Sequence, residues 1–331
     1  MATTIAPEKI LKELAELWAD SAKQHDGDSS MGVLRACSMT LLVFAEAGED
    51  TPELGETMAA LMPEHPARAI LVKLSGVGDR SLTERVYSQC WMPFGQRRQV
   101  CCEQVEITVS DAALADLQSV VLPLTVADLP VIVWCRSTRL LDIPAFRNVA
   151  AMADKVVFNG ASASDPAAIL QRACDAAARG VMLGDLSWTM LTRWREMLAQ
   201  VFENQENSAL LARIANVEVE WGGSRYITAL YLGAWVRDSL TAGGVNPQLR
   251  ISRTAEVDHL KVRLTGEGIA VELKREDDRM IVMLNGASQC TNLPQPTDYL
   301  LMREELGIVR HDPVFEKTLK SAAQLAHPIQ R

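Results

Sequence analysis

Short apolar segments alternate with amphipathic helical segments through the first two hundred residues of this 331-residue chain. Residues 69–74, 130–135 and 155–159 are rich in valine, isoleucine and leucine, as strands that are buried on both faces are. Residues 84–91 and Gln99–Val109 are predicted to be two further strands joined as a hairpin. The alternation therefore predicts an α/β layer, and the hairpin makes its sheet a mixed one. Further predicted elements are a strand over residues 33–45 and helices after Pro7 and over residues 51–62, 111–121, 143–152 and 166–179.

The composition changes after residue 202, where the polar run of residues 204–208 has the character of a linker. A domain boundary is therefore predicted near residue 205. It gives an N-terminal α/β domain over residues 1–205 and a smaller α+β domain over residues 206–331. In the second domain a helix over residues 224–241 precedes four short strands, and tight turns between the last three predict an antiparallel meander with two closing helices. The four strands are predicted at Gln248–Arg253, residues 259–265, residues 269–275 and Arg279–Leu284.

One amphipathic helix is predicted over residues 187–202. Ser187 is its predicted N-cap, because a serine hydroxyl accepts a backbone N–H bond left open at a helix start. Trp194 falls on the apolar side of the helix, with methionine, leucine, valine and phenylalanine side chains, and Arg193 falls on the polar side. The segment thus combines an apolar stripe with a charged outer face.

Trp188 and Arg195 stand at the border of this apolar stripe, seven residues apart. A guanidinium at that position needs a carboxylate or carbonyl partner, because an unpaired buried charge costs on the order of several kcal/mol. Asp128 and Asp185 are candidate partners for Arg195 or Arg193. Two interpretations stay open. The helix is either a core element whose arginine is satisfied internally, or a partner-binding surface, since tryptophan and arginine are enriched among the residues that dominate interface energies.

Four motifs occur in order between about residue 31 and about residue 203. They are His65-Pro-Ala-Arg68, Cys102-Glu-Gln-Val-Glu106, Leu122-Pro-Leu-Thr-Val-Ala-Asp-Leu-Pro-Val-Ile-Val-Trp134 and the segment of residues 184–202. In these motifs the chain resembles the glucose-6-phosphate dehydrogenase assembly protein family, OpcA. The C-terminal third follows the family more loosely.

The resemblance implies a non-catalytic protein whose partner is glucose-6-phosphate dehydrogenase, the entry enzyme of the oxidative pentose phosphate pathway. It implies that the protein promotes the assembly or allosteric activation of that enzyme, and that it needs no cofactor. The alternative is an enzyme that acts on a sugar phosphate in a cleft between the two domains. The residues expected in the partner-binding surface or the core beneath it are Asp185, Trp188, Arg193, Trp194 and Arg195, with Arg68 and Trp134 nearby in the fold.

The net charge of −9 argues against nucleic acids and anionic membranes as partners, because both attract basic surfaces. A long apolar run is missing, because residues 120–134 are interrupted by Pro123, Asp128 and Pro130 and are too short to span a bilayer. The first thirty residues show an amphipathic helical pattern without the apolar core of a secretory signal. A cytoplasmic location is therefore expected, in which the seven cysteines are mostly reduced.

Sequence motifs for catalysis or cofactor binding are lacking. In Gly76-Val-Gly78-Asp-Arg-Ser81, serine stands where a dinucleotide fingerprint has its third glycine, and the residues that follow predict a strand instead of a helix. The sequence contains no CxxC, HExxH or GxSxG spacing. The expectation is therefore no cofactor, no metal and no enzymatic activity.

Cys101 and Cys102 are adjacent in a predicted strand, so their side chains are expected on opposite faces of the sheet. They are a candidate redox site, with Cys90 opposite one of them in the hairpin, and a redox-responsive regulator is a third functional hypothesis. The alternative is that they are small apolar residues of the sheet. Arg97 and Arg98, in the hairpin loop, are either solvated or able to bind an acidic partner or a phosphate.

Overall fold

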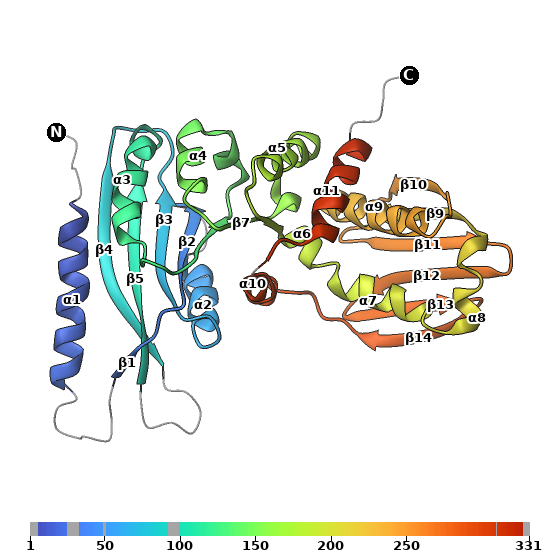
Figure 1. The fold of residues 1–331 in the computed structure, drawn as a ribbon, viewed down its shortest axis with the longest axis horizontal. Helices are drawn as coiled ribbons and strands as arrows, with labels where there is room; N and C mark the ends of the chain where they lie inside the picture. The colour runs from blue at the N-terminus through green and yellow to red at the C-terminus, as the bar shows by residue number, and fades with distance from the viewer. Residues whose placement is uncertain (1–5, 25–32, 49–50, 92–98, 309, 327–331) are drawn as a thin grey trace. The chain divides into compact units, whose positions relative to one another are not determined.

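The structure is a computed structural model in which the chain forms two compact units (Figure 1). Unit 1 comprises Met1–Phe158, Val181–Gly184 and Asp298–Gly307, and unit 2 comprises Asn159–Gly180, Asp185–Thr297 and Ile308–Arg331. Each unit combines helices with a mixed sheet, which confirms the predicted α/β class. The residues that the structure describes are 6–24, 33–48, 51–91, 99–308 and 310–326.

An eight-stranded sheet forms the centre of unit 1. Its strands follow the order β1-β5-β3-β2-β6-β7-β8, and β4 pairs with β5. The pairs that join β1, β5, β3, β2, β6 and β7 are parallel, whereas β4 and β5 are antiparallel. The strands are β1 (Val33–Arg35), β2 (Met39–Glu46), β3 (Ala67–Leu74), β4 (Leu82–Trp91), β5 (Gln99–Val109), β6 (Val131–Cys135), β7 (Lys155–Phe158) and β8 (Leu183–Asp185).

The middle strands β2, β3 and β6 are buried along almost their whole length, which explains their unbroken apolar sequences. From β2 the chain passes through α2 to β3 on one side, and it later places β6 on the other side. The strand order therefore reverses at β2. The helices of unit 1 are α1 (Pro7–Gln24), α2 (Thr51–Leu61), α3 (Leu117–Val121), α4 (Pro144–Ala150) and α10 (Asp298–Gly307), with short 3-10 turns η1 (Asp111–Asp116), η2 (Leu122–Leu124) and η3 (Thr138–Asp142).

A six-stranded sheet in the order β10-β9-β11-β12-β13-β14 forms the centre of unit 2. Helix α9 packs against β9, β10 and β11, and α11 packs against α9 and α5. Buried and more exposed residues alternate along β11 and β12, so one face of the sheet is turned to the core. The strands are β9 (Ile214–Trp221), β10 (Gln248–Arg253), β11 (Leu260–Gly266), β12 (Ile269–Glu276), β13 (Arg279–Leu284) and β14 (Ala287–Asn292).

The helices of unit 2 include the two segments into which the predicted helix of residues 187–202 divides. They are α5 (Pro166–Ala178), α6 (Leu186–Thr189), α7 (Thr192–Val201), α8 (Gln205–Ser208), α9 (Tyr226–Ala242) and α11 (Pro313–Ala326), with 3-10 turns η4 (Gly160–Ser162) and η5 (Leu211–Arg213). No helix among residues 6–24, 33–48, 51–91, 99–308 and 310–326 is long and apolar enough to cross a membrane.

The predicted strand over residues 33–45 is two strands, β1 and β2. They separate because they pair with different partners: β1 pairs with the beginning of β5, and β2 lies between β3 and β6. At the break, the backbone N–H of Ser38 bonds the carbonyl of Pro66 at 2.7 Å instead of continuing a ladder. The predicted hairpin of β4 and β5 is confirmed, and the backbones of Cys90 and Cys101 lie directly opposite each other.

The predicted meander of unit 2 is confirmed, but it has one strand more than predicted. Asn285 and Gly286 form the two-residue turn that joins β13 to β14, and both have positive φ angles, 48° and 88°. This is the conformation of a type I′ hairpin turn, for which Asn-Gly is the favoured pair. Strand β14 therefore had a signal in the sequence, the Asn-Gly pair that precedes it.

The polar run at residues 204–208 lies inside unit 2, so the division into compact units differs from the predicted boundary near residue 205. Its two asparagine side chains bond the backbone at helix ends. The Asn204 Oδ1 accepts the Glu206 N–H at 2.8 Å and begins α8, and the Asn207 Nδ2 donates to the Val201 carbonyl at the end of α7 at 2.7 Å. The division into an N-terminal α/β domain of residues 1–205 and a C-terminal α+β domain of residues 206–331 stays a prediction.

Candidate partner-binding site

Asp185 is completely buried in unit 2, and its carboxylate joins three separate segments. Its Oδ1 accepts the backbone N–H groups of Gly160 at 2.9 Å and Ser187 at 2.8 Å, and its Oδ2 accepts the Tyr231 hydroxyl at 2.8 Å. Burial raises the pKa of this carboxyl to about 6. The hydrogen bonds favour the charged form and lower the pKa, but the effect of burial is larger. The carboxylate thus fixes η4, the start of α6 and the middle of α9 to one another.

Asp185, and not Ser187, is the N-cap of α6, which corrects the predicted cap. The Ser187 hydroxyl instead accepts the Ala161 N–H at 3.0 Å and donates to the Asn159 Oδ1 at 3.1 Å. Gly160 is required here, because a Cβ at this position would lie 2.6 Å from the Asp185 Oδ2. Since Asp185 is engaged with these groups, the predicted pairing of Asp185 with Arg193 or Arg195 was wrong.

Trp188 is buried at the centre of an aromatic cluster in unit 2. Its ring centroid lies 6.1 Å from that of Tyr231 and 5.9 Å from that of Phe315, and its Nε1 donates to the Asp312 Oδ2 at 3.1 Å. The Arg195 guanidinium carbon lies 3.6 Å from the Trp188 ring centroid, in a cation–π contact. The guanidinium at the border of the apolar stripe therefore stacks on an aromatic face, and its Nη2 also donates to the Thr192 Oγ1 at 3.0 Å.

The predicted single helix is interrupted between α6 and α7, where the Leu191 N–H bonds the Trp188 carbonyl three residues back at 2.9 Å. Within α7, Trp194 is buried, whereas the side chain of Arg193 is 72% exposed and forms an ion pair with Glu196 at 2.8 Å. The segment therefore has an inner side of aromatic residues that support the core and an outer side from which Arg193 reaches solvent.

Replacing Arg195 with glutamate is expected to lower the free energy of unfolding by about 1–2 kcal/mol, because an anion would face the negative face of the Trp188 ring. Replacing Arg193 with glutamate serves as the matched control, with a change within about 0.5 kcal/mol for an exposed position. Urea denaturation followed by far-UV circular dichroism measures both changes. Equal stability of the two variants would show that the stacked cation does not stabilise unit 2.

Arg68 and Trp134 belong to unit 1, whereas the other candidate residues belong to unit 2. Arg68 is buried on β3, where its Nε bonds the Glu103 Oε2 at 2.5 Å and its guanidinium bonds the Leu124 carbonyl at 2.7 Å. Trp134 is buried on β6 and has the Arg136 guanidinium 5.2 Å from its ring centroid. β2 lies between their two strands, so both are core residues of one sheet.

Cys102 is buried, and burial raises the pKa of its thiol to about 11. A thiol with such a pKa is almost entirely protonated at neutral pH, and the protonated form is the unreactive one. This opposes a redox role for Cys102, whereas the role of Cys101 stays a prediction. Arg97 and Arg98 lie outside the residues that the structure describes.

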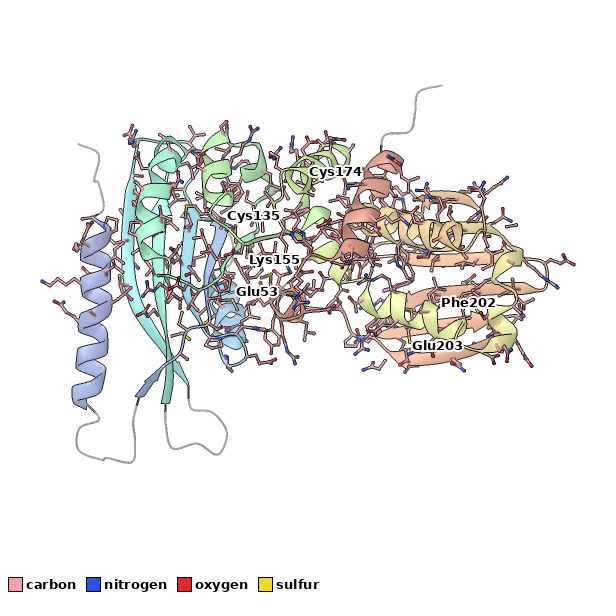
Figure 2. All side chains as sticks on the ribbon, viewed as in Figure 1. Glu53, Cys135, Lys155, Cys174, Phe202 and Glu203 are labelled. Carbon is pink, nitrogen blue, oxygen red and sulfur yellow. The ribbon has the colours of Figure 1, made fainter. Side chains whose placement is uncertain are left out.

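A buried ion pair in unit 1 had no clear signal in the sequence. Lys155, which is labelled in Figure 2, lies at the start of β7. Its Nζ lies 2.5 Å from the Glu305 Oε2 of α10, and it also donates to the Glu305 carbonyl at 2.8 Å. Gly184 leaves the room for this pair, because a Cβ there would overlap the Glu305 carboxylate. A lysine and a glutamate 150 residues apart cannot be paired from spacing alone.

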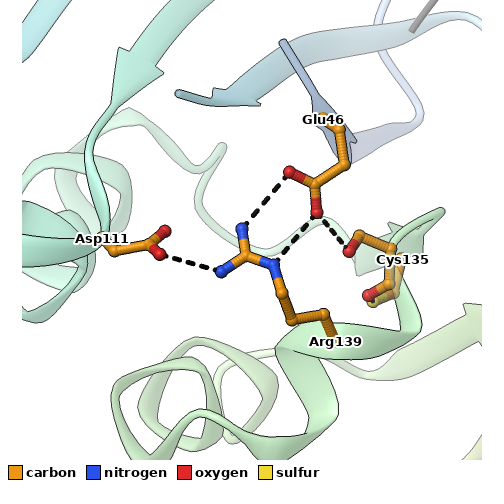
Figure 3. A network of polar contacts seen from close by, with 5 residues as sticks. Glu46, Asp111, Cys135 and Arg139 are labelled. Carbon is orange, nitrogen blue, oxygen red and sulfur yellow. Dashed lines mark hydrogen bonds and ion pairs between the residues drawn. The ribbon is translucent and has the colours of Figure 1, made fainter. Parts of the chain in front are cut away.

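A second network lies where β2 and β6 end, at the point where the strand order reverses (Figure 3). Arg139 bonds both oxygens of Glu46 at 3.2 Å and one oxygen of Asp111 at 2.9 Å. The Ser137 hydroxyl donates to Glu46 at 2.5 Å. Although burial acts to raise it, the pKa of Glu46 is lowered by the hydrogen bonds from Arg139 and Ser137 and by the Arg139 charge.

This edge is where open α/β sheets bind ligands, because the loops diverge there. In dinucleotide-binding folds a glycine-rich turn follows the strand at the reversal point, but the sequence after β2 begins Ala47-Gly-Glu. The Gly76 loop follows β3 and leads into strand β4, so it has no helix N-terminus behind it, as predicted. The arrangement of charges here is an ion-pair network that braces the sheet edge. Among the described residues, no group of three metal-ligating side chains is placed to hold a metal ion.

Comparisons with known proteins give two family matches in order along the chain. Residues 58–175 match a model described as "Glucose-6-phosphate dehydrogenase subunit N-terminal domain", and residues 181–319 match the model that describes the C-terminal domain of the same subunit. The second match includes β9 to β14 and the first half of α11, the region in which the sequence resemblance was looser. Together the two models match well over half of the chain.

Curated relatives carry the same family name. The chain is 25% identical over 221 residues to an OxPP cycle protein OpcA of Synechococcus elongatus, an alignment that covers 66% of this chain and 46% of the relative. It is 26% identical over 141 residues to the OpcA protein of Nostoc punctiforme, with 43% and 30% covered. The matched part spans less than half the length of these relatives.

A solved structure shares the overall fold at low sequence identity. It is an oxidoreductase from Sinorhizobium meliloti, with a TM-score of 0.50, 11% identity, and 88% of this chain and 96% of that chain covered. At this identity the likeness concerns the fold alone. Because both domain models match in order and the curated relatives bear the same name, this chain belongs to the OpcA family of glucose-6-phosphate dehydrogenase subunit proteins.

Proposed function

We propose that this chain is a non-catalytic partner of glucose-6-phosphate dehydrogenase that acts in the cytoplasm and promotes the enzyme's assembly or activity in the oxidative pentose phosphate pathway. The observation that carries the proposal is the match of both domain models in order. The charge network at the carboxyl edge of the unit 1 sheet agrees with a non-catalytic role. Its carboxylates are already engaged, because Glu46 is bound by Arg139 and Ser137 and Asp111 is bound by Arg139.

A binding protein acts on an enzyme through differential affinity alone. If it binds the active or fully assembled state of the dehydrogenase more tightly than other states, it shifts the population toward that state. A preference of about 1.4 kcal/mol gives a tenfold shift. This mechanism needs no bound nucleotide, metal or nucleophile in the binding protein. It does need a contact surface that the fold of the binding protein holds rigidly.

The outer side of α7 is the proposed contact surface. Its inner side is held in place by buried Trp194 and, through the preceding turn, by the stack of Arg195 on Trp188. Arg193 and Glu196 stand on the opposite side, with side chains 72% and 47% exposed. A well-supported arginine at a surface is the kind of residue that dominates the affinity of protein interfaces.

Replacing Arg193 with glutamate is expected to weaken binding of the cognate dehydrogenase at least about tenfold. The change removes a cation from the proposed contact surface and adds a second negative charge beside Glu196. Surface plasmon resonance with the dehydrogenase immobilised measures the effect. Arg179 to glutamate is the matched control, since Arg179 is also an exposed arginine of unit 2 and follows α5. If both variants bind like the wild type, the outer side of α7 is not part of the interface.

A further inference from the structure

Strand β14 forms one end of the unit 2 sheet. Among the described residues no strand pairs with its outer side. All six of its residues are exposed, whereas β11 and β12 have alternating buried positions. An exposed sheet edge of this kind presents a row of backbone N–H and C=O groups that another strand can bind.

The hairpin turn determines which residues present those groups. Because the loop has two residues, Leu284 and Ala287 form a hydrogen-bonded pair, and such pairs then alternate with non-bonded pairs along β13 and β14. The Leu293 N–H bond to the Asp278 carbonyl, at 2.7 Å, continues the same alternation. Ser288, Cys290 and Asn292 fall in the non-bonded pairs, so their backbone groups point to the open edge.

The open edge lacks the usual protection against strand pairing. β14 has the sequence Ala-Ser-Gln-Cys-Thr-Asn, without charge or proline, and its register with β13 runs without a bulge. The opposite end of the sheet differs, because β10 carries Arg250 and Arg253. In unit 1, the edge strand β4 carries Glu84 and Arg85, and β1 and β8 have only three residues each. Among the described edge strands, β14 therefore combines six residues with no charged side chain and no bulge.

We propose that β14 pairs antiparallel with β14 of a second copy of this chain, about a two-fold axis through Cys290. In this register Cys290 faces Cys290, and Ser288 faces Asn292 on both sides. Each of these facing pairs exchanges two backbone hydrogen bonds, because all three residues direct their groups outward. The open edge of one copy is then completed by the identical edge of the other.

A second copy fits this edge better than a charged partner does. Two uncharged strands meet without like-charge repulsion, and the outward residues are spaced symmetrically about Cys290. This pairing of two copies does not involve glucose-6-phosphate dehydrogenase. Since a single strand pair buries a small area, the dimer is expected to be concentration-dependent.

Sedimentation velocity of the full chain over a hundredfold concentration range tests the pairing. The wild type is expected to shift from monomer to dimer, and Cys290→Pro is expected to raise the dissociation constant at least tenfold. Proline is suitable because the Cys290 N–H does not bond β13, so the hairpin itself loses no hydrogen bond. Cys290→Ser, which keeps the backbone unchanged, is the matched control and is expected to dimerise like the wild type.

Cross-linking gives a second readout that does not depend on a proline variant. A short bismaleimide is expected to join two wild-type chains through Cys290, which is an exposed free cysteine, and to fail with Cys290→Ser. A wild type that stays monomeric and is not cross-linked would overturn the proposal. So would a Cys290→Pro variant that keeps the wild-type dimer but loses binding to the dehydrogenase, since the edge would then belong to that enzyme.

Discussion

Replacing Lys155 with methionine is expected to lower the free energy of unfolding by about 3–5 kcal/mol, the usual effect of removing one partner of a buried ion pair. The side chains of Lys155 and Glu305 are each only 3% exposed, and their charged atoms lie 2.5 Å apart. The methionine fills much of the space of the lysine stem, so the loss is chiefly that of leaving the Glu305 carboxylate buried without its cation.

Urea denaturation of the wild type and the variant at pH 7 measures this loss. The matched control is Arg303→Met, in the same helix α10, which removes an ion pair with Glu64 at 2.7 Å whose side chains are 47% and 46% exposed. That control is expected to cost at most about 1 kcal/mol, because solvent screens the pair. Equal losses in the two variants would contradict the argument from burial. A second change, Glu305→Leu, is expected to recover part of the stability lost in Lys155→Met.

The Asp185 carboxyl is expected to make stability fall as the pH rises from about 4 to about 6. Burial raises its pKa in the folded protein to about 6, from an ordinary value of 3.8. Between these values the folded state holds a proton that the unfolded state has released, so raising the pH favours unfolding. A pKa shift of this size contributes about 3 kcal/mol to the free energy of unfolding. That contribution is fully present only below about pH 4 and is lost above about pH 6.

Other carboxyl groups titrate in the same range, so the effect of Asp185 is isolated by comparison with Asp185→Asn. Asparagine has nearly the same shape, accepts the Gly160 and Ser187 N–H bonds, and stays neutral. The difference in unfolding free energy between variant and wild type is expected to move by up to about 3 kcal/mol in favour of the variant between pH 4 and pH 7. A difference that does not change with pH would show that the pKa of Asp185 is ordinary.

Local patterns predicted most elements of the fold, because burial imposes them on short stretches of sequence. The buried strands β3 and β6 and the hairpin of β4 and β5 followed from apolar runs and turn residues. The break between β1 and β2 could not be predicted, because it depends on which distant strand each one pairs with. Strand β14 could have been predicted from Asn285-Gly286, the strongest short hairpin signal in the chain.

The details of the site depend on contacts between residues far apart in the chain. Trp188 and Arg195 were identified as a pair at the border of the apolar stripe, but periodicity alone could not give their stacking. The cap at Asp185 and the bond from Trp188 to Asp312, 124 residues away, depend on tertiary packing. The glycines that resemble a dinucleotide fingerprint follow β3, whereas the strand order reverses at β2. Topology, which a single sequence does not show, decides where such a site would lie.

The most direct test of the proposed function is to mix the purified chain with its cognate glucose-6-phosphate dehydrogenase. Size-exclusion chromatography with light scattering gives the mass of the complex, and activity is read across the same peak. The proposal predicts co-elution, with a lower KM or a higher kcat for the dehydrogenase and no turnover of sugar phosphates by the chain alone. Separate elution with unchanged kinetics, or turnover by the chain alone, would contradict it.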